Sequence, residues 1–133
     1  MLTLFNYIYE FGAHCTSIIA RHEDGTIMHG RNLDFFFGPI LRKMVYQGNF
    51  YKDGKQVFQS AMFGGVVAPF TAFKKGTYSI SQNTRTTSEN GFVGFALNAV
   101  NTFLGYQKPD SLIRETFLQC PDYECAVKHL KEA

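Results

Sequence analysis

The sequence predicts an α+β fold, with strands in its first two-thirds and helices in its last third. Two Asp-Gly pairs stand between stretches of alternating or β-rich residues, and this is a strong signal for β-hairpins. After residue 91 the apolar residues recur at helical spacing instead. Strands followed by helices are typical of helices laid on one face of an antiparallel sheet. A chain of 133 residues fits one domain.

The first hairpin joins a strand at Cys15–His22 to a return strand at Thr26–Arg31. We expect Asp24 and Gly25 to form a two-residue type I′ turn between them. The second hairpin has Lys52-Asp53-Gly54-Lys55 as its turn. Its strands, and one further short strand after Gly76, are expected at Met44–Tyr51, Gln56–Phe63 and Thr77–Gln82.

Three helices are expected in the last third. The first covers residues 92–103, where Phe92, Ala96, Ala99, Val100 and Phe103 share one helical face. The second is Ser111–Gln119. The third is Tyr123–Ala133, with Asp122 as its N-cap. Because no stop signal ends this last helix, we interpret the chain as a fragment of a longer protein.

Composition excludes several classes of function. The formal charge is +2 with no basic stripe, so no nucleic acid partner is expected. The histidines are scattered and no metal site or cofactor is predicted. No apolar run approaches the ~20 residues of a membrane span, and residues 1–11 do not resemble a signal peptide. The many aromatic residues are expected in the core rather than in an acyl-chain pocket.

The chain has three cysteines, an odd number. Cys120 and Cys125 flank the expected start of the last helix. We expect them to be two separate thiols, with one of them partly buried, and a disulfide between them is the alternative. Cys15 is left as a candidate nucleophile.

The first hairpin places Cys15 near two charged residues. Counting outward from a two-residue turn, Ile18 faces Arg31 and Cys15 faces Asp34. Arg31 and Asp34 are three residues apart, so a regular strand would send them to opposite faces. They can share a site only if the strand ends or bulges nearby, and Gly30 is a candidate position for such a bulge.

Cys, Arg and Asp make chemical sense together. A thiolate is the nucleophile, and a neighbouring guanidinium lowers the pKa of a thiol. A carboxylate alone would raise it, so Asp34 needs another role, such as holding an amine. The alternative is an inert, buried Cys15 beside a surface Arg–Asp pair.

Two motifs are similar to those of a known family. The stretch CTSIIA at 15–20 and the stretch HGRNLDF at 29–35 resemble the acid ceramidases and the N-acylethanolamine-hydrolysing acid amidases. Their wider relatives are the bile-salt hydrolases and penicillin V acylases. All are N-terminal-nucleophile hydrolases with a four-layer αββα sandwich. The resemblance implies that fold here, with only its N-terminal part in this chain.

The resemblance also implies roles. Residues 1–14 would be the end of a pro-segment, and residues 15–133 the N-terminal portion of the catalytic domain. Autocleavage between His14 and Cys15 would free the α-amine that serves as base for the thiol. Asp34 would hold that amine, and Arg31 would sit beside the thiol and bind or polarise the substrate. The family's oxyanion-hole Asn would lie beyond residue 133, so residues 1–133 alone are expected to lack full activity.

The function implied is a cysteine amidase that hydrolyses fatty-acid amides, either ceramide or N-acylethanolamines. Its expected partners are the lipid amide substrate, a membrane surface or lipid-presenting partner, and the remaining chain of the same precursor. Lysosomal or secreted localisation follows from the family alone. Two alternatives stay open: an amidase of the bile-salt hydrolase or penicillin acylase type, and a truncated, non-catalytic remnant that binds lipid or a partner.

Overall fold

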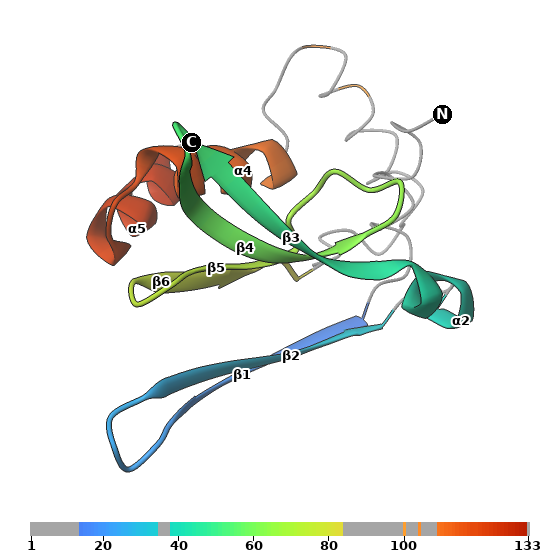
Figure 1. Ribbon diagram of the computed structural model, residues 1–133, viewed down its shortest axis with the longest axis horizontal. Coiled ribbons are helices and arrows are strands. Elements are labelled where there is room, and N and C mark those ends of the chain that lie inside the picture. The colour runs from blue at the N-terminus through green and yellow to red at the C-terminus, as the bar shows by residue number, and fades with distance from the viewer. Residues whose placement is uncertain (1–13, 35–37, 84–99, 101–103, 105–108, 133) are drawn as a thin grey trace.

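The computed structural model describes residues 14–34, 38–83, 100, 104 and 109–132. These residues form three layers (Figure 1): two helices, a four-stranded antiparallel sheet, and a two-stranded antiparallel sheet. The α+β prediction is confirmed. The expected helix at 92–103 and the end of the pro-segment fall almost wholly outside the described residues.

The small sheet pairs β1 (His14–Arg21) with β2 (Ile27–Asp34). A short helix α2 (Gly38–Leu41) and a 3₁₀ turn (Arg42–Met44) lead into the large sheet. That sheet has the order β3-β4-β5-β6. Its strands, and the two helices that follow, are β3 (Val45–Lys52), β4 (Lys55–Phe63), β5 (Thr71–Lys74), β6 (Tyr78–Ser81), α4 (Pro109–Gln119) and α5 (Tyr123–Glu132).

The core lies between the large sheet and the helices. Phe117 of α4 is fully buried, and its ring stacks on those of Phe58 and Tyr78 at centroid distances of 4.8 and 5.1 Å. Phe50 stacks on the other side of Phe58 at 4.2 Å. Stacked aromatic rings add to the stabilisation from buried apolar area. These aromatic residues therefore pack in the core, as expected.

The other face of the large sheet carries the small sheet, which lies below β5 and β6 in Figure 1. Hydroxyl groups line this contact. Ser17 Oγ lies 2.8 Å from Ser81 Oγ, and His29 Nδ1 lies 2.7 Å from Ser79 Oγ. Because strand side chains alternate between faces, the odd-numbered residues of β1, β2 and β6 meet here. The interface between the sheets is thus polar along this edge.

The two Asp-Gly hairpins have different turns. Between β3 and β4, Asp53 and Gly54 both have positive φ values, of 52° and 75°, and Lys52 pairs with Lys55. The predicted hairpin is confirmed there, and positive φ at both loop residues makes its turn type I′. Between β1 and β2, positive φ occurs at Gly25 but not at Asp24. The expected two-residue type I′ turn is therefore wrong for the first hairpin.

The first hairpin instead has a three-residue loop, Glu23 to Gly25, closed by a bond from His22 N to Thr26 O of 2.8 Å. The Asp24 carboxylate accepts a hydrogen bond from Thr26 N at 2.8 Å. This side chain supports a turn in which only the glycine adopts the left-handed conformation. One extra loop residue shifts the pairing of the whole hairpin by one.

Residues around the start of α5 join the two helices. Asp122 accepts a hydrogen bond from Cys125 N at 2.9 Å, which confirms it as the N-cap. Cys120 and Cys125 form a disulfide, with their Cα atoms 5.3 Å apart. The expectation of two separate thiols is therefore wrong. The cap fixes the first turn of α5, and this turn places Cys125 beside Cys120 at the end of α4. Sequence spacing alone does not show this proximity.

Sequence reasoning missed one strand of the large sheet. Residues 71–74 form β5, which pairs with β4 and β6. Four residues are too few to show periodicity, and the strand exists through its pairing on both sides. The other boundaries differ from the predictions by a few residues, with β2 the largest case because it continues to Asp34.

Candidate functional site

The pairing of β1 with β2 determines what surrounds Cys15. Cys15 pairs with Leu33, Ser17 pairs with Arg31, and His14 pairs with Asp34. The register is regular from one end of the hairpin to the other, without a bulge at Gly30. A shift of one residue exchanges the two faces of a strand.

This register corrects the predicted arrangement. Asp34 does not face Cys15, because the three-residue loop moves it opposite His14. The same shift brings Arg31 to the face that carries Cys15. Arg31 stands diagonally across from Cys15, a separation that a long side chain can span. The difficulty of placing Arg31 near the thiol thus disappears without any bulge.

Arg31 joins the small sheet to the large one through its two terminal nitrogens. Nη1 donates to Phe70 O at 2.8 Å and to Thr71 Oγ1 at 2.5 Å. Nη2 donates to Cys15 Sγ at 3.4 Å and to Gln82 O. A guanidinium beside a sulfur favours the thiolate, the form of cysteine that attacks a carbonyl carbon.

Apolar side chains also pack near Cys15. It is half-buried against a small cluster whose buried members are Ala68 and Phe70. Leu33 and Phe63 pack against the same cluster. Among the described residues, the sulfur therefore lies near an apolar cluster and the Arg31 guanidinium, and an apolar neighbourhood strengthens the electrostatic effect of a charge.

Asp34 lies on the other face of β2. Its carboxylate is exposed and accepts two hydrogen bonds from Asn32 Nδ2, at 2.9 and 2.8 Å. Its backbone pairs with His14, the residue before Cys15. The structure thus brings Cys15 and Arg31 into contact, and it places Asp34 across from the peptide group that precedes Cys15.

Sequence reasoning missed the residues that hold Arg31. Phe70, Thr71 and Gln82 lie 39 to 51 residues after it. Thr71 is the first residue of β5, Phe70 directly precedes it, and Gln82 directly follows β6. Their sequence neighbourhood has no motif that points to a guanidinium.

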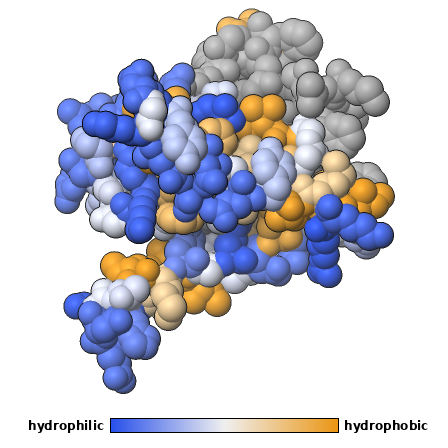
Figure 2. All heavy atoms as spheres, viewed as in Figure 1, coloured by the Kyte–Doolittle hydropathy of each residue, from blue (hydrophilic) through white to orange (hydrophobic). Residues whose placement is uncertain are grey.

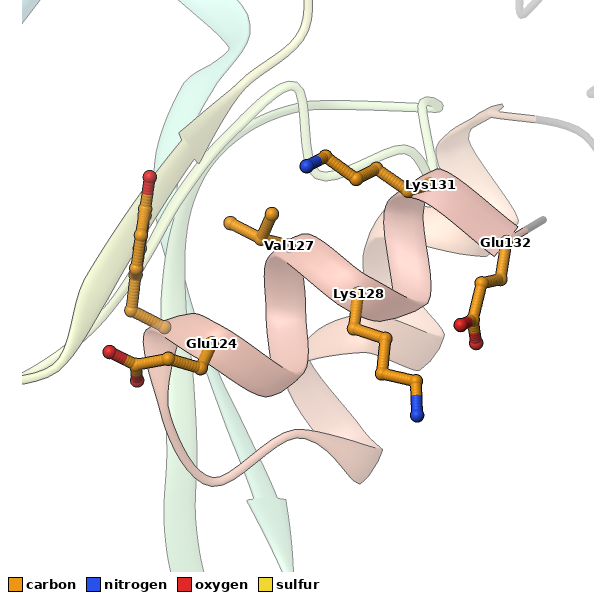
Figure 3. A pocket seen from close by; sticks show the side chains of 6 residues that line it. Glu124, Val127, Lys128, Lys131 and Glu132 are labelled. Carbon is orange, nitrogen blue, oxygen red and sulfur yellow. The ribbon is translucent and has the colours of Figure 1, made fainter.

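A different part of the surface is hollowed but carries no comparable chemistry. A shallow hollow of about 360 Å³ runs along α5 (Figure 3), and it lies on the helical layer, across the large sheet from Cys15. Charged residues Glu124, Lys128 and Glu132, spaced four apart, border it, as on an ordinary solvated helix face.

Within the described residues there is no group of three or more His, Cys, Asp or Glu side chains that could hold a metal ion. In the same part of the chain, no helix has the length and apolar content needed to span a bilayer.

Comparison with known proteins identifies two groups of relatives. No protein-family model matches the chain. It is 37% identical to the N-acylethanolamine-hydrolyzing acid amidase of Rattus norvegicus over 127 residues, which is 93% of this chain and 33% of that protein. It is 30% identical to the acid ceramidase of Bos taurus over 151 aligned positions, covering 92% of this chain and 38% of that protein. Its homologues are the acid ceramidases and the N-acylethanolamine-hydrolysing acid amidases. The chain spans about a third of the length of these acid-amidase relatives.

The fold of this acid-amidase homologue matches a solved structure as well. The ortholog of N-acylethanolamine-hydrolyzing acid amidase from Caenorhabditis elegans superimposes with a TM-score of 0.75 at 24% identity, over 88% of this chain and 48% of that one. The fold is therefore of the N-terminal-nucleophile hydrolase type. The described helix, sheet and sheet layers correspond to part of the αββα sandwich.

Proposed function

We propose that the protein is a cysteine amidase in which Cys15 is the nucleophile. The observation that carries this proposal is the Arg31 guanidinium 3.4 Å from the Cys15 sulfur, in a chain homologous to two kinds of amidase. A structural cysteine in a core has no need of a fixed cation. A nucleophilic cysteine does, because only its thiolate attacks.

The proposed activation is autocleavage of the His14–Cys15 bond. While Cys15 is acylated on its nitrogen it has no α-amine, and so no base of its own. Its thiol attacks the His14 carbonyl, the nitrogen is released as an amine, and water hydrolyses the resulting thioester. The conversion of an amide to a thioester is uphill, so the fold must stabilise the product side. Asp34, whose backbone pairs with His14, is the proposed acceptor for the new ammonium group.

In the proposed turnover the α-amine of Cys15 accepts the proton of the thiol. The thiolate attacks the carbonyl of the lipid amide, and the tetrahedral intermediate collapses as the substrate amine leaves with that proton. Water then hydrolyses the thioester and releases the fatty acid. Arg31 holds the thiolate beside the substrate carbonyl, and an α-amine with an ordinary pKa of ~7.7–8.0 is well matched to this proton transfer.

The substrate proposed is a fatty-acid amide, either a ceramide or an N-acylethanolamine, because these are the amides in the names of the relatives. Such a lipid is supplied from a membrane surface or by a lipid-presenting partner, because it dissolves poorly in water. An acidic, lysosomal compartment is proposed from the same names. Bile-acid conjugates and small acyl amides are the competing substrates.

Mass spectrometry of the full-length protein at acidic pH tests the activation step. We expect a new N-terminus at Cys15 that forms without added protease and is absent in Cys15→Ala. Asp34→Asn should cleave more slowly, whereas Glu23→Gln, an exposed carboxylate at the tip of the same hairpin, should cleave normally.

Turnover is then measured on the same samples with ceramide, N-acylethanolamine and a glycine-conjugated bile acid. Fatty-acid amides should be preferred by the wild-type protein. An uncleaved precursor that hydrolyses amides at full rate would contradict the N-terminal-nucleophile mechanism. A fully cleaved protein that binds lipid without turnover would instead favour the non-catalytic remnant.

A further inference from the structure

Contacts at one end of the β5–β6 hairpin orient the Arg31 side chain. Phe70 O accepts from Gln82 N at 2.9 Å as well as from Arg31 Nη1, so the start of β5 and the end of β6 are tied together there. Gln82 O accepts from Nη2. Two of these acceptors are backbone carbonyls. The third, the Thr71 hydroxyl, is a side chain.

The geometry of a guanidinium makes this third contact important. The group is planar and its N–H bonds point in fixed directions. Two acceptors on Nη1, Phe70 O and Thr71 Oγ1, fix the plane of the group and its rotation. The position of Nη2 beside Cys15 Sγ is then fixed as well, because the guanidinium is rigid.

Thr71 is itself well anchored. It is the first residue of β5, and its backbone pairs with Ala61 of β4 and Ser81 of β6. Ser60 Oγ, which is buried, donates to Thr71 O at 2.9 Å. A β-branched side chain on a strand between two others has few rotamers available. The hydroxyl therefore has a fixed place against which the guanidinium can be oriented.

We propose that Thr71 is a positioning residue for Arg31, and that its hydroxyl holds the guanidinium against the Cys15 sulfur. The inference deepens the proposed function, because it rests on Cys15 acting as the nucleophile. Thr71 touches neither the thiol nor the substrate in this account. It acts through Arg31, by keeping the positive charge where it favours the thiolate.

Alkylation of the thiol by iodoacetamide measures this effect without any turnover. The chain has three cysteines and two are in the disulfide, so under non-reducing conditions the reagent reports on Cys15. Thr71→Ala removes the hydroxyl, and Thr71→Ser keeps it. At about pH 6 we expect Thr71→Ala to react about 3- to 10-fold more slowly than wild type and Thr71→Ser within about twofold of it, with all three converging near pH 10.

Thr77→Ala, at the exposed turn of the same hairpin, is the matched control and should react like wild type. Circular dichroism establishes that each variant is folded. Equal rates for Thr71→Ala and Thr71→Ser would overturn the proposal, as would a slowing that persists unchanged at high pH, because that pattern indicates lost access to the sulfur. Unfolding of Thr71→Ala would raise its rate toward that of an exposed thiol, and would also count against a positioning role.

Failure of this inference is separate from failure of the proposed function. If Cys15→Ala retained amidase activity in the full-length protein, Cys15 would not be the nucleophile, but the alkylation rates would still show whether Thr71 orients Arg31. If Cys15→Ala is inactive and Thr71→Ala alkylates normally, only the positioning role is lost.

Discussion

Individual side chains connect the layers of this molecule, and Arg31 and Tyr78 are two of them. Arg31 connects β2 to the thiol of β1 and to the ends of β5 and β6. On the far side of the sheet, Tyr78 OH donates to Thr116 O and Cys120 O at the end of α4, both at 3.2 Å. Lys74 Nζ donates to the same Cys120 carbonyl at 2.6 Å. A helix C-terminus has unsatisfied carbonyls and a negative dipole end, so these donors stabilise α4.

Tyr78 makes the stability of this contact depend on pH. Burial, and to a smaller extent the charge of Asp122, raise the pKa of Tyr78 to about 12. The folded-state pKa lies above the ordinary value of ~10, so the stabilisation by the neutral phenol is complete below about pH 10 and is lost as pH rises toward 12. Tyr78→Phe should lower the free energy of unfolding by ~1 kcal/mol at neutral pH, and this difference should shrink above about pH 10.

Urea unfolding of the two proteins at stepped pH measures the difference directly. Comparing variant with wild type cancels the other groups that titrate at high pH. Tyr51→Phe, whose side chain is 64% exposed, is the control and should differ little from wild type throughout. A difference for Tyr78→Phe that stays constant from pH 8 to 12 would contradict this assignment.

At the scale of elements, the turns and the helix junction decide how strands and helices meet. Both hairpin loops contain an Asp-Gly pair, at Asp24-Gly25 and at Asp53-Gly54. The first loop nevertheless has three residues, and the second has two. The extra residue in the first loop places Arg31 and Cys15 on one face. At the other end of the chain, the Asp122 cap and the disulfide fix α5 against α4.

The disulfide leads to a thiol count. Maleimide labelling of the denatured, unreduced protein should modify one cysteine per chain, and labelling after reduction should modify three. By the chain-entropy account, closing so short a loop stabilises the fold by about 2 kcal/mol, so Cys120→Ala/Cys125→Ala should unfold at lower urea concentration. Mass spectrometry counts the cysteines that maleimide has labelled. Three labelled thiols before reduction would rule the bridge out.

At the scale of the whole molecule, the small sheet has no buried side chain among its described residues. Its hairpin extends past the large sheet in Figure 1, and Figure 2 shows apolar side chains on it beside the charged tip. Four large apolar residues there are exposed by 52% to 72%: Ile18, Ile19, Ile27 and Met28. Ile19 and Ile27 lie on the face of the hairpin that carries Cys15, and Ile18 and Met28 lie on the opposite face, so each face presents an exposed apolar pair. Exposed apolar side chains on a strand pair favour association.

We therefore expect the purified chain of residues 1–133 to self-associate through this hairpin. Ile27→Lys should reduce the association, because a charge on an apolar strand face opposes contact between copies. Ile40→Lys changes an isoleucine of α2 that is 61% exposed, away from the hairpin, and serves as the control. Light scattering at increasing protein concentration is the measurement. A wild-type chain that stays monomeric, or equal effects of both lysines, would contradict the prediction.

The sequence alone determined the α+β class, the two hairpins, the helix at α5 with its cap, and Cys15 and Arg31 as candidates. These depend on local preferences: turn residues, periodicity, capping, and a motif similar to a known family. Only the tertiary structure decided that Arg31 shares a face of the hairpin with Cys15 and that residues 71–74 form β5. It also decided the disulfide between Cys120 and Cys125 and the hydrogen bond from Arg31 to Thr71. Register depends on one residue in a loop, and the partners of Arg31 lie 39 to 51 residues away. Contacts of that separation arise from the packing of one sheet on another, and no local pattern specifies them.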